Sequence, residues 1–315
     1  MVDVPVNLAS IDIGTNSTLL LIAEYDGTDL YPIKNCAEIT RLGQAVNKTR
    51  RLAPEAAERT FKVLTRYKEL CNRHNVAHVS IGGTSALRDA VNGEEFLGRV
   101  HDELGWDIQI LTGNLEAELT YLSTRNEFEE IDSDYLVADI GGGSTEFIHG
   151  DKKQIHFRKS VDFGTVRFTE KFIRNDPPTD QEIENLRKAV QESLHSNLDQ
   201  LKISPDNTIF IGVAGTVTTL QAVEKEMTEY DESMIHKSQL SQAQIEELFD
   251  KFCSVTLEKR KKLPGLQPQR ADVIIAGNII VQEIMKHFAF SSMYISDRGV
   301  RYGLMYDYIR KNFGE

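Results

Sequence analysis

The sequence is poor in cysteine and has no long apolar run. Its three cysteines, Cys36, Cys71 and Cys253, are scattered at spacings that match neither a metal site nor a redox pair. We therefore expect reduced thiols and a cytoplasmic protein. The longest apolar stretches are too short to span a bilayer, and no basic segment followed by an apolar core marks a signal peptide at the N-terminus. No membrane partner is expected.

Positive charge is also scarce. The chain has 36 lysines and arginines against 48 aspartates and glutamates, a formal net charge of −12. Because proteins that bind nucleic acid or anionic membranes are normally basic, we expect no nucleic-acid partner. A polyanionic substrate would require bound cations or a locally basic region. With 315 residues, 40% of them hydrophobic, the chain suits two domains with ordinary cores.

A glycine-rich stretch after an apolar run is the strongest local signal. The run at 135–138 predicts the end of a buried strand. Three glycines then allow several backbone N–H groups to converge on one anion, and two hydroxyl residues add donors. The carboxylates at both ends would repel a phosphate, which suggests a divalent cation between them; oxygen ligands favour Mg²⁺, with Mn²⁺ as the alternative. The stretch reads Asp139, Ile140, Gly141, Gly142, Gly143, Ser144, Thr145, Glu146.

The same pattern occurs at two other places. Residues 8–13 form an apolar strand that contains Asp12 and leads into a turn of small residues. This turn consists of Gly14, Thr15, Asn16 and Ser17. Residues 209–213 lead into Gly215 and Thr216, which lie near a predicted helix N-terminus, where anions bind. Three such turns predict a phosphate ligand, and the distance between the two Asp-x-Gly copies predicts a duplicated α/β unit.

Two further charged groups stand beside glycine turns. Arg88 lies one helical turn after Gly82-Gly83-Thr84-Ser85, so it contacts either a phosphate or a carboxylate, or else is an exposed helix arginine. Glu116 and Glu118 begin a predicted helix and cannot both face one point. If one of them is a catalytic base we favour Glu116; the alternative is that both are acids favoured by the helix dipole. A basic run, Lys48-Thr49-Arg50-Arg51, precedes Pro54 and the next helix.

Strand and helix patterns alternate along the rest of the chain. The acidic run 126–134 suggests a surface connection and a domain junction. We expect one domain at 1–124, with a C-terminal helix at about 300–315 packed back on it, and a second domain at 125–299. Strands are expected at 8–13, 18–25, 30–40, 76–81, 107–111, 147–150, 154–161, 208–213 and 293–296. Helices are expected from 54, 94, 112, 179, 241, 273 and 300.

Taken together, these motifs resemble the exopolyphosphatase / guanosine pentaphosphate phosphohydrolase (Ppx/GppA) family of the actin–hexokinase–sugar kinase superfamily. The matching stretches follow the family's order and span nearly the whole chain. They are ASIDIGTNSTLLLIAE, TSALRDAVN, GNLEAE, DIGGGSTEF, DFGTVRFTE, VAGTVTTL, LPGLQPQRADVIIAG and SDRGVRYGLM.

The resemblance implies two actin-like, ribonuclease H-like α/β domains with a cleft between them, in the short form without an additional helical domain. It implies that Glu116 positions and deprotonates water, and that Arg88 contacts phosphate. Asp139 and Glu146 correspond to acidic residues that hold Mg²⁺ or line the site. We expect Asp12 to be a metal ligand together with them. The family commonly has Gly-x-Glu-Glu-Ala-Arg where this chain has Leu115 and Glu118 in place of the first Glu and the Arg, so Glu118 stays open as the base.

The implied reaction is Mg²⁺-dependent release of orthophosphate from polyphosphate, conversion of pppGpp to ppGpp, or both. Polyphosphate or guanosine penta/tetraphosphate would be the partner, with a homodimer as in relatives. One alternative is an acceptor-dependent kinase of the same superfamily, which shares the phosphate turns. The other is a non-catalytic sensor of polyphosphate or a guanosine alarmone.

Overall fold

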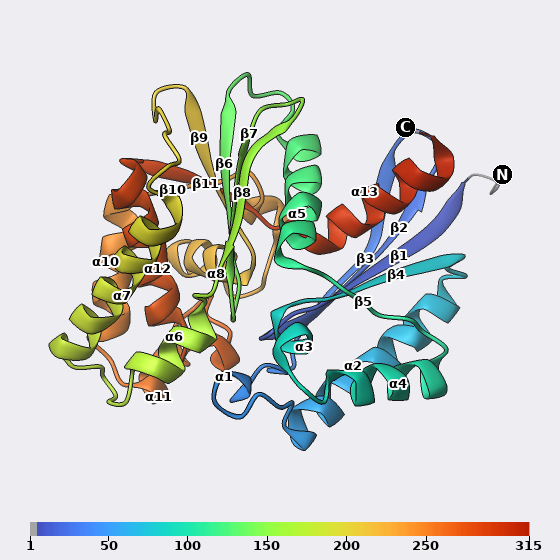
Figure 1. Ribbon diagram of the computed structural model, residues 1–315, viewed down its shortest axis with the longest axis horizontal. Helices are drawn as coiled ribbons and strands as arrows, with labels where there is room; N and C mark the ends of the chain where they lie inside the picture. Colours follow the sequence, from blue (N-terminus) through green and yellow to red (C-terminus); the bar gives the residue numbers. More distant parts are fainter. Residues whose placement is uncertain (1–4, 315) are drawn as a thin grey trace. The chain divides into compact units, whose positions relative to one another are not determined.

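The chain is built of two α/β units. The computed structural model describes residues 5–314, and it divides into a first unit, Met1–Ser123 with Gly299–Glu315, and a second unit, Thr124–Arg298. The junctions expected from the sequence, 124/125 and 299/300, differ from these by one residue. Each unit contains one mixed sheet with helices packed on it (Figure 1). The predicted α/β fold with two such domains is confirmed.

The first unit begins with a three-stranded meander and ends with the C-terminal helix. Its elements are β1 (Val6–Ile13), β2 (Ser17–Tyr25), β3 (Leu30–Ile39), α1 (Val46–Thr49), α2 (Pro54–Arg73), β4 (His78–Gly83), α3 (Ser85–Asp89), α4 (Gly93–Leu104), β5 (Gln109–Ile110), α5 (Gly113–Glu127) and α13 (Val300–Phe313). The last residues of α5, from Thr124 on, belong to the second unit.

The second unit repeats this plan with more helices. Its elements are β6 (Asp134–Ile140), β7 (Thr145–Gly150), β8 (Ile155–Val161), α6 (Thr165–Phe172), α7 (Asp180–Leu198), β9 (Thr208–Val213), α8 (Gly215–Glu224), α9 (Glu232–Ile235), β10 (Gln239–Ser241), α10 (Gln242–Cys253), α11 (Leu257–Arg260), a 3₁₀ turn (Pro268–Arg270), α12 (Ile274–Phe288) and β11 (Ser292–Ser296).

The two sheets share one topology. The first has the order β3-β2-β1-β4-β5, and the second contains the same order as β8-β7-β6-β9-β11, with β10 added at its edge. In both, the first three strands are antiparallel neighbours, and the next two are parallel to the central strand or to each other. This repetition is the duplicated unit predicted from the two Asp-x-Gly stretches.

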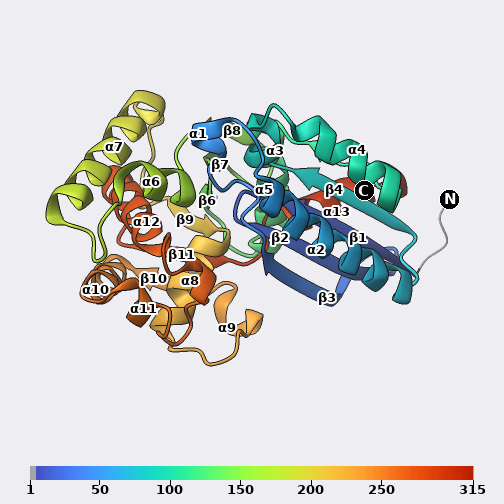
Figure 2. The same ribbon diagram turned by 90° about the horizontal axis from the view of Figure 1, so that it is seen from below.

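Alternation along β1 explains the layers of the first unit. Ala9, Ile11 and Ile13 face a core formed with α2 and α4, whereas Leu8 faces a second core formed with α13. Figures 1 and 2 show α2 and α4 over one face of the sheet and α13 across the other. Pro54 at the first turn of α2 suits that helix start because its missing N–H would have no intrahelical acceptor there.

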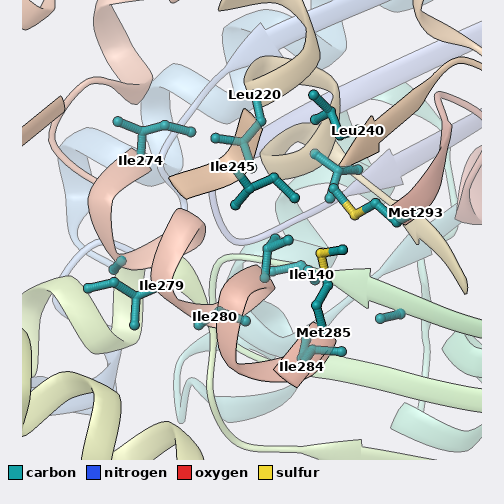
Figure 3. Packing of buried hydrophobic residues seen from close by; sticks show 14 of the residues in the cluster. Ile140, Leu220, Leu240, Ile245, Ile274, Ile279, Ile280, Ile284, Met285 and Met293 are labelled. Carbon is teal, nitrogen blue, oxygen red and sulfur yellow. The ribbon is translucent and has the colours of Figure 1, made fainter. Parts of the chain in front are cut away.

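The core of the second unit surrounds α12. This helix is apolar on nearly all sides, which is typical of a helix buried on all sides. Figure 3 shows Ile280, Ile284 and Met285 of α12 near Ile140, the last residue of β6. Burial at that point anchors the strand end immediately before the second glycine turn. The helix expected from 179 is α7, and Thr179 and Glu182 form a capping box at its start.

Several short elements were not predicted, namely α1, α9, β10, α11 and the 3₁₀ turn. The acidic run 126–134 contains the end of α5 and the surface connection to β6, in which Glu129, Glu130 and Asp132 are exposed. The junction between units lies before it, at Ser123 and Thr124. Within the described residues, none of the helices combines the length and the apolar character that a membrane crossing requires.

Candidate functional site

Each unit presents a glycine turn of the same geometry. In the first unit the Gly14 N–H donates to the Ser17 carbonyl at 2.9 Å, and in the second the Gly141 N–H donates to the Ser144 carbonyl at 3.1 Å. A Cβ on either glycine would lie 3.0 Å from that same carbonyl oxygen, closer than side chains normally approach. The tight turn therefore favours glycine at the first position of both copies.

Backbone donors in both turns are left over for a ligand. In the part of the chain that the structure describes, the N–H groups of Thr15 and Asn16 donate no hydrogen bond, and neither do those of Gly142 and Gly143. Successive unused N–H groups in such a turn form a concave anion site. The Asn16 side chain is 7% exposed, and neither its amide nitrogen nor its oxygen has a partner among the described residues. Buried polar groups are normally bonded, so a polar ligand is expected there.

Some hydroxyls of the turns are already engaged. Thr15 shares a hydrogen bond of 2.7 Å with the Ser85 hydroxyl, and the Thr145 hydroxyl donates to the Phe163 carbonyl at 2.8 Å. The Thr216 hydroxyl donates to the Ile140 carbonyl at 3.0 Å. The Thr145 and Thr216 hydroxyls are thus engaged with backbone carbonyls and the Thr15 hydroxyl with Ser85, while the unused N–H groups remain for a ligand.

The segment after the third strand braces the turn in each unit. In the first unit the N–H groups of Arg41 and Gly43 donate to the carbonyls of Asn16 and Thr15, both at 2.9 Å. In the second unit the first residues of α6 donate to the carbonyls of Gly141 and Gly142 at 2.9–3.0 Å. Arg167 adds a bond of 2.7 Å from its Nε to the Gly143 carbonyl, which places a guanidinium beside the second turn.

Two carboxylates face each other across β6 and β7. Asp139 and Glu146 are directly opposite in the strand register, and they are 7% and 1% exposed. Directly opposed side chains have Cβ atoms roughly 5 Å apart, and like charges there are destabilising. Ser160, opposite Glu146 on β8, donates to the Glu146 carboxylate at 2.7 Å. In the first unit Asp12 occupies the place of Asp139, but its opposite residue is Leu19.

The Asp139 and Glu146 pair fits a divalent cation in part. Oxygen-only donors, held opposite each other and oriented by a hydroxyl, suit Mg²⁺. Within residues 5–314 no group of three or more His, Cys, Asp or Glu side chains could hold a metal by itself. Water and substrate phosphate oxygens would have to complete the coordination. Mg²⁺ commonly binds in that way, through one or two carboxylates plus phosphates.

Glu116 lies near the start of α5 and is 7% exposed. Its carboxylate is 3.2 Å from a guanidinium nitrogen of Arg88, and that same nitrogen donates to the Leu111 carbonyl at 2.7 Å. Arg88 therefore orients Glu116. Of the alternatives expected for this arginine, the structure shows the contact with a carboxylate. Glu118 is only partly buried. Glu116 is thus the more buried of the two acids.

A second arginine lies against the third turn. A Cβ on Gly215 would lie 2.3–2.5 Å from the guanidinium of Arg270, so only glycine lets this arginine pack there. Burial lowers the pKa of Arg270 to about 10, and Coulombic interactions with Tyr230 and Asp297 oppose that shift. Arg270 therefore stays cationic at neutral pH beside the N-terminus of α8.

The structure thus brings together Arg88 with Glu116, and Asp139 with Glu146. The first unit carries Asp12, the turn from Gly14 to Ser17, Arg88 and Glu116; the second carries the other predicted site residues. Sequence reasoning missed Arg167, Ser160 and Arg270. Arg167 and Arg270 stand in motifs that already carried the family resemblance, DFGTVRFTE and LPGLQPQRADVIIAG, so their place in those motifs was the available signal.

Known proteins match almost the whole chain. A family model described as the Ppx/GppA phosphatase family matches residues 21–312. Exopolyphosphatase 2 of Mycobacterium tuberculosis is 38% identical over 288 residues, which cover 89% of this chain and 90% of that protein.

Solved structures agree with these sequence matches. The crystal structure of the Aquifex aeolicus member of the Ppx/GppA family is 33% identical, with a TM-score of 0.82, and the match covers 98% of this chain and 99% of that one. An exopolyphosphatase from Cytophaga hutchinsonii has a TM-score of 0.89 at 24% identity, with 98% and 100% of the two chains covered. The second likeness bears on the fold alone.

Proposed function

The chain belongs to the Ppx/GppA phosphatase family, and from this premise we propose that it hydrolyses the terminal phosphoanhydride bond of inorganic polyphosphate. Each turnover releases one orthophosphate and shortens the polymer by one unit. The proposal is supported by exopolyphosphatase relatives that match about nine-tenths of the chain. The nucleotide pppGpp ends in the same type of bond and is the second candidate substrate.

The observation that carries the proposal is the matched pair of glycine turns with unused N–H groups. A terminal phosphoanhydride carries several anionic oxygens close together, and these require hydrogen-bond donors or cations. In phosphoryl transfer, charge spreads over the equatorial oxygens of the transferred group, and fixed donors stabilise it. Arg167 and Arg270 add positive charge beside the second and third turns.

Glu116 is assigned as the base. A water molecule hydrogen-bonded to its carboxylate attacks the terminal phosphorus, the bridging P–O bond breaks, and the proton of the water passes to Glu116. Arg88 holds the carboxylate through its contacts with Glu116 and the Leu111 carbonyl. General-base assistance contributes typically ~10²–10⁴-fold to a rate.

Asp139 and Glu146 are assigned as metal ligands, and Asp12 as the corresponding acid of the first unit. Mg²⁺, when bound, supplies positive charge that neutralises the substrate oxygens. Ser160 keeps one oxygen of Glu146 oriented. Mn²⁺ prefers the same oxygen donors and is expected to substitute.

A pair of isosteric variants tests the assignment. Glu116→Gln is expected to lower kcat for phosphate release by at least ~10²-fold with KM little changed, because the group acts on the chemical step. Glu118→Gln is the matched control two residues along α5 and is expected to keep near wild-type turnover. The assignment is wrong if Glu118→Gln abolishes activity while Glu116→Gln retains it.

A further inference from the structure

A basic loop projects from the first unit immediately after the segment that braces its glycine turn. Lys48, Arg50 and Arg51 are all exposed, and within the described part of the chain none of them makes an ion pair. Several other exposed cations of this unit pair with acids: Lys62 pairs with Glu58, and Arg73 pairs with Glu69. In a chain of net charge −12, three unpaired cations in four residues form a local exception.

The loop is held firmly although its tip is exposed. Leu42, Val46 and Leu52 are at most 4% exposed and anchor it in the core beneath the sheet. The Val91 N–H donates to the Arg50 carbonyl at 2.8 Å, and the Asn92 side chain bonds both the N–H and the carbonyl of Leu52. The three cations are therefore presented on a fixed backbone, which reduces the ordering entropy that binding would cost.

Two residues of the loop have a left-handed backbone conformation, which residues other than glycine rarely adopt. Ala45 has φ 62° and Arg50 has φ 56°, both in the left-handed region where glycine is least strained. Glycine would fit either position without a steric cost. Arg50 is the left-handed C-cap of α1, so its charge is held at a defined point of the backbone.

The loop is coupled directly to the phosphate turn. Gly43 donates to the Thr15 carbonyl, and a Cβ on Gly43 would lie 2.3 Å from the Thr15 side chain. In the second unit the corresponding position after the third strand is occupied by α6, which braces its turn without such a loop. The duplication thus gives this chain one turn that continues into a basic loop and one that does not.

We propose that Lys48, Arg50 and Arg51 form a polyanion subsite that binds inner phosphates of a linear polyphosphate, beyond those held at the Gly14–Ser17 turn. This inference rests on the proposed function, because it extends the same substrate away from the reacting end. With its terminal phosphate at the turn, tripolyphosphate has two phosphates left for three cations, whereas a long chain has enough charged units to engage all three. The subsite therefore selects for chain length.

Binding without Mg²⁺ tests the subsite independently of hydrolysis. The affinities of long-chain polyphosphate and tripolyphosphate are measured by calorimetry for the wild type and for Lys48→Ala/Arg50→Gly/Arg51→Ala. A control, Lys62→Ala/Arg66→Ala/Arg73→Ala, removes three exposed cations from α2 that each pair with an acid. Both variants change the net charge equally.

The loop variant is expected to bind long-chain polyphosphate at least ~10-fold more weakly at low salt, and tripolyphosphate as the wild type does. The slope of log affinity against log salt should fall by roughly 2, since each lost contact on a single-stranded polyanion contributes ~0.7. The control should bind both ligands as the wild type does. Arg50→Gly alone should weaken long-chain binding while leaving Tm unchanged or higher, because it removes the charge and relaxes the backbone.

Three results would overturn the subsite: unchanged long-chain binding by the loop variant, an equal loss in the α2 control, or binding of single-stranded RNA as tight as that of polyphosphate. A wild type that binds long chains through the loop yet releases no phosphate with Mg²⁺ would uphold the subsite and overturn the proposed hydrolysis. The two inferences can therefore fail separately.

Discussion

Gly164 is the position where one added methyl group should disable the second phosphate turn. It lies at the N-cap of α6 in an extended conformation, φ −159° and ψ 169°, that alanine adopts without strain. A Cβ there would lie 2.5 Å from the Gly142 carbonyl carbon, 2.6 Å from its oxygen and 2.7 Å from the Gly143 nitrogen. All three are backbone atoms of the turn, so no side chain can move aside.

The size of the effect follows from these distances. Ordinary contact begins near 3.4 Å, so α6 and the turn must separate by 3.4 − 2.5 = 0.9 Å. The three hydrogen bonds from α6 to the carbonyls of Gly141 and Gly142, now 2.9–3.0 Å, would lengthen beyond useful range. Overpacking of this kind costs typically ~1–3 kcal/mol. Displacing a reacting group by ~1 Å costs about 10²-fold in rate.

For Gly164→Ala we therefore expect a Tm lower by about 4–8 °C for a loss of ~2 kcal/mol. We also expect kcat/KM for polyphosphate to fall by about 10²-fold. The control is Gly98→Ala in α4, where no atom lies within 4 Å of the added Cβ; it should raise stability by ~0.5–1 kcal/mol and leave activity unchanged. Wild-type KM and kcat in a folded Gly164→Ala protein would refute the role given to this turn.

Three further predictions concern single contacts. Arg88→Gln removes the ion pair to Glu116. It should lower kcat, and it should lower the free energy of unfolding by up to ~3 kcal/mol, and Tm with it. An unchanged kcat would show that Arg88 does not orient the base. Ser160→Ala removes the hydroxyl that donates to Glu146. It should raise the Mg²⁺ concentration that gives half-maximal activity by about 10-fold or more. An unchanged Mg²⁺ titration would contradict the role of Ser160. Burial raises the pKa values of Cys71 and Cys253 to about 11, so both are thiols at pH 8. Their alkylation should be ~10²-fold slower than that of an exposed cysteine until denaturant is added. Rapid labelling of the folded protein would contradict the burial of these two thiols.

The elements that the sequence predicted best are those with a local cause. Apolar runs ending in glycine turns located β1, β6 and β9 to within two residues. The strand at 18–25 and the start of the helix at Thr179 also depend on neighbouring residues alone. Short elements such as α9 and β10 were missed because a stretch of three or four residues shows too little periodicity.

The candidate site was predictable as a set of residue types but not as a set of contacts. Arg88 meets Glu116 across 28 positions, and Arg270 meets Gly215 across 55, because strands and helices far apart in sequence end close together. No local pattern encodes such approaches. The pairing of Asp139 with Glu146 follows from a hairpin with a four-residue turn, and it could be read only once the register was known.

Phosphate release by the purified protein with Mg²⁺ is the most direct test of the proposed reaction. Long-chain polyphosphate, pppGpp and ATP are compared side by side, and the length of the remaining polyphosphate is followed. We expect orthophosphate from polyphosphate, with the polymer shortening one unit at a time from its end and ATP a poor substrate. Absence of phosphate release from all three would contradict the proposed hydrolase.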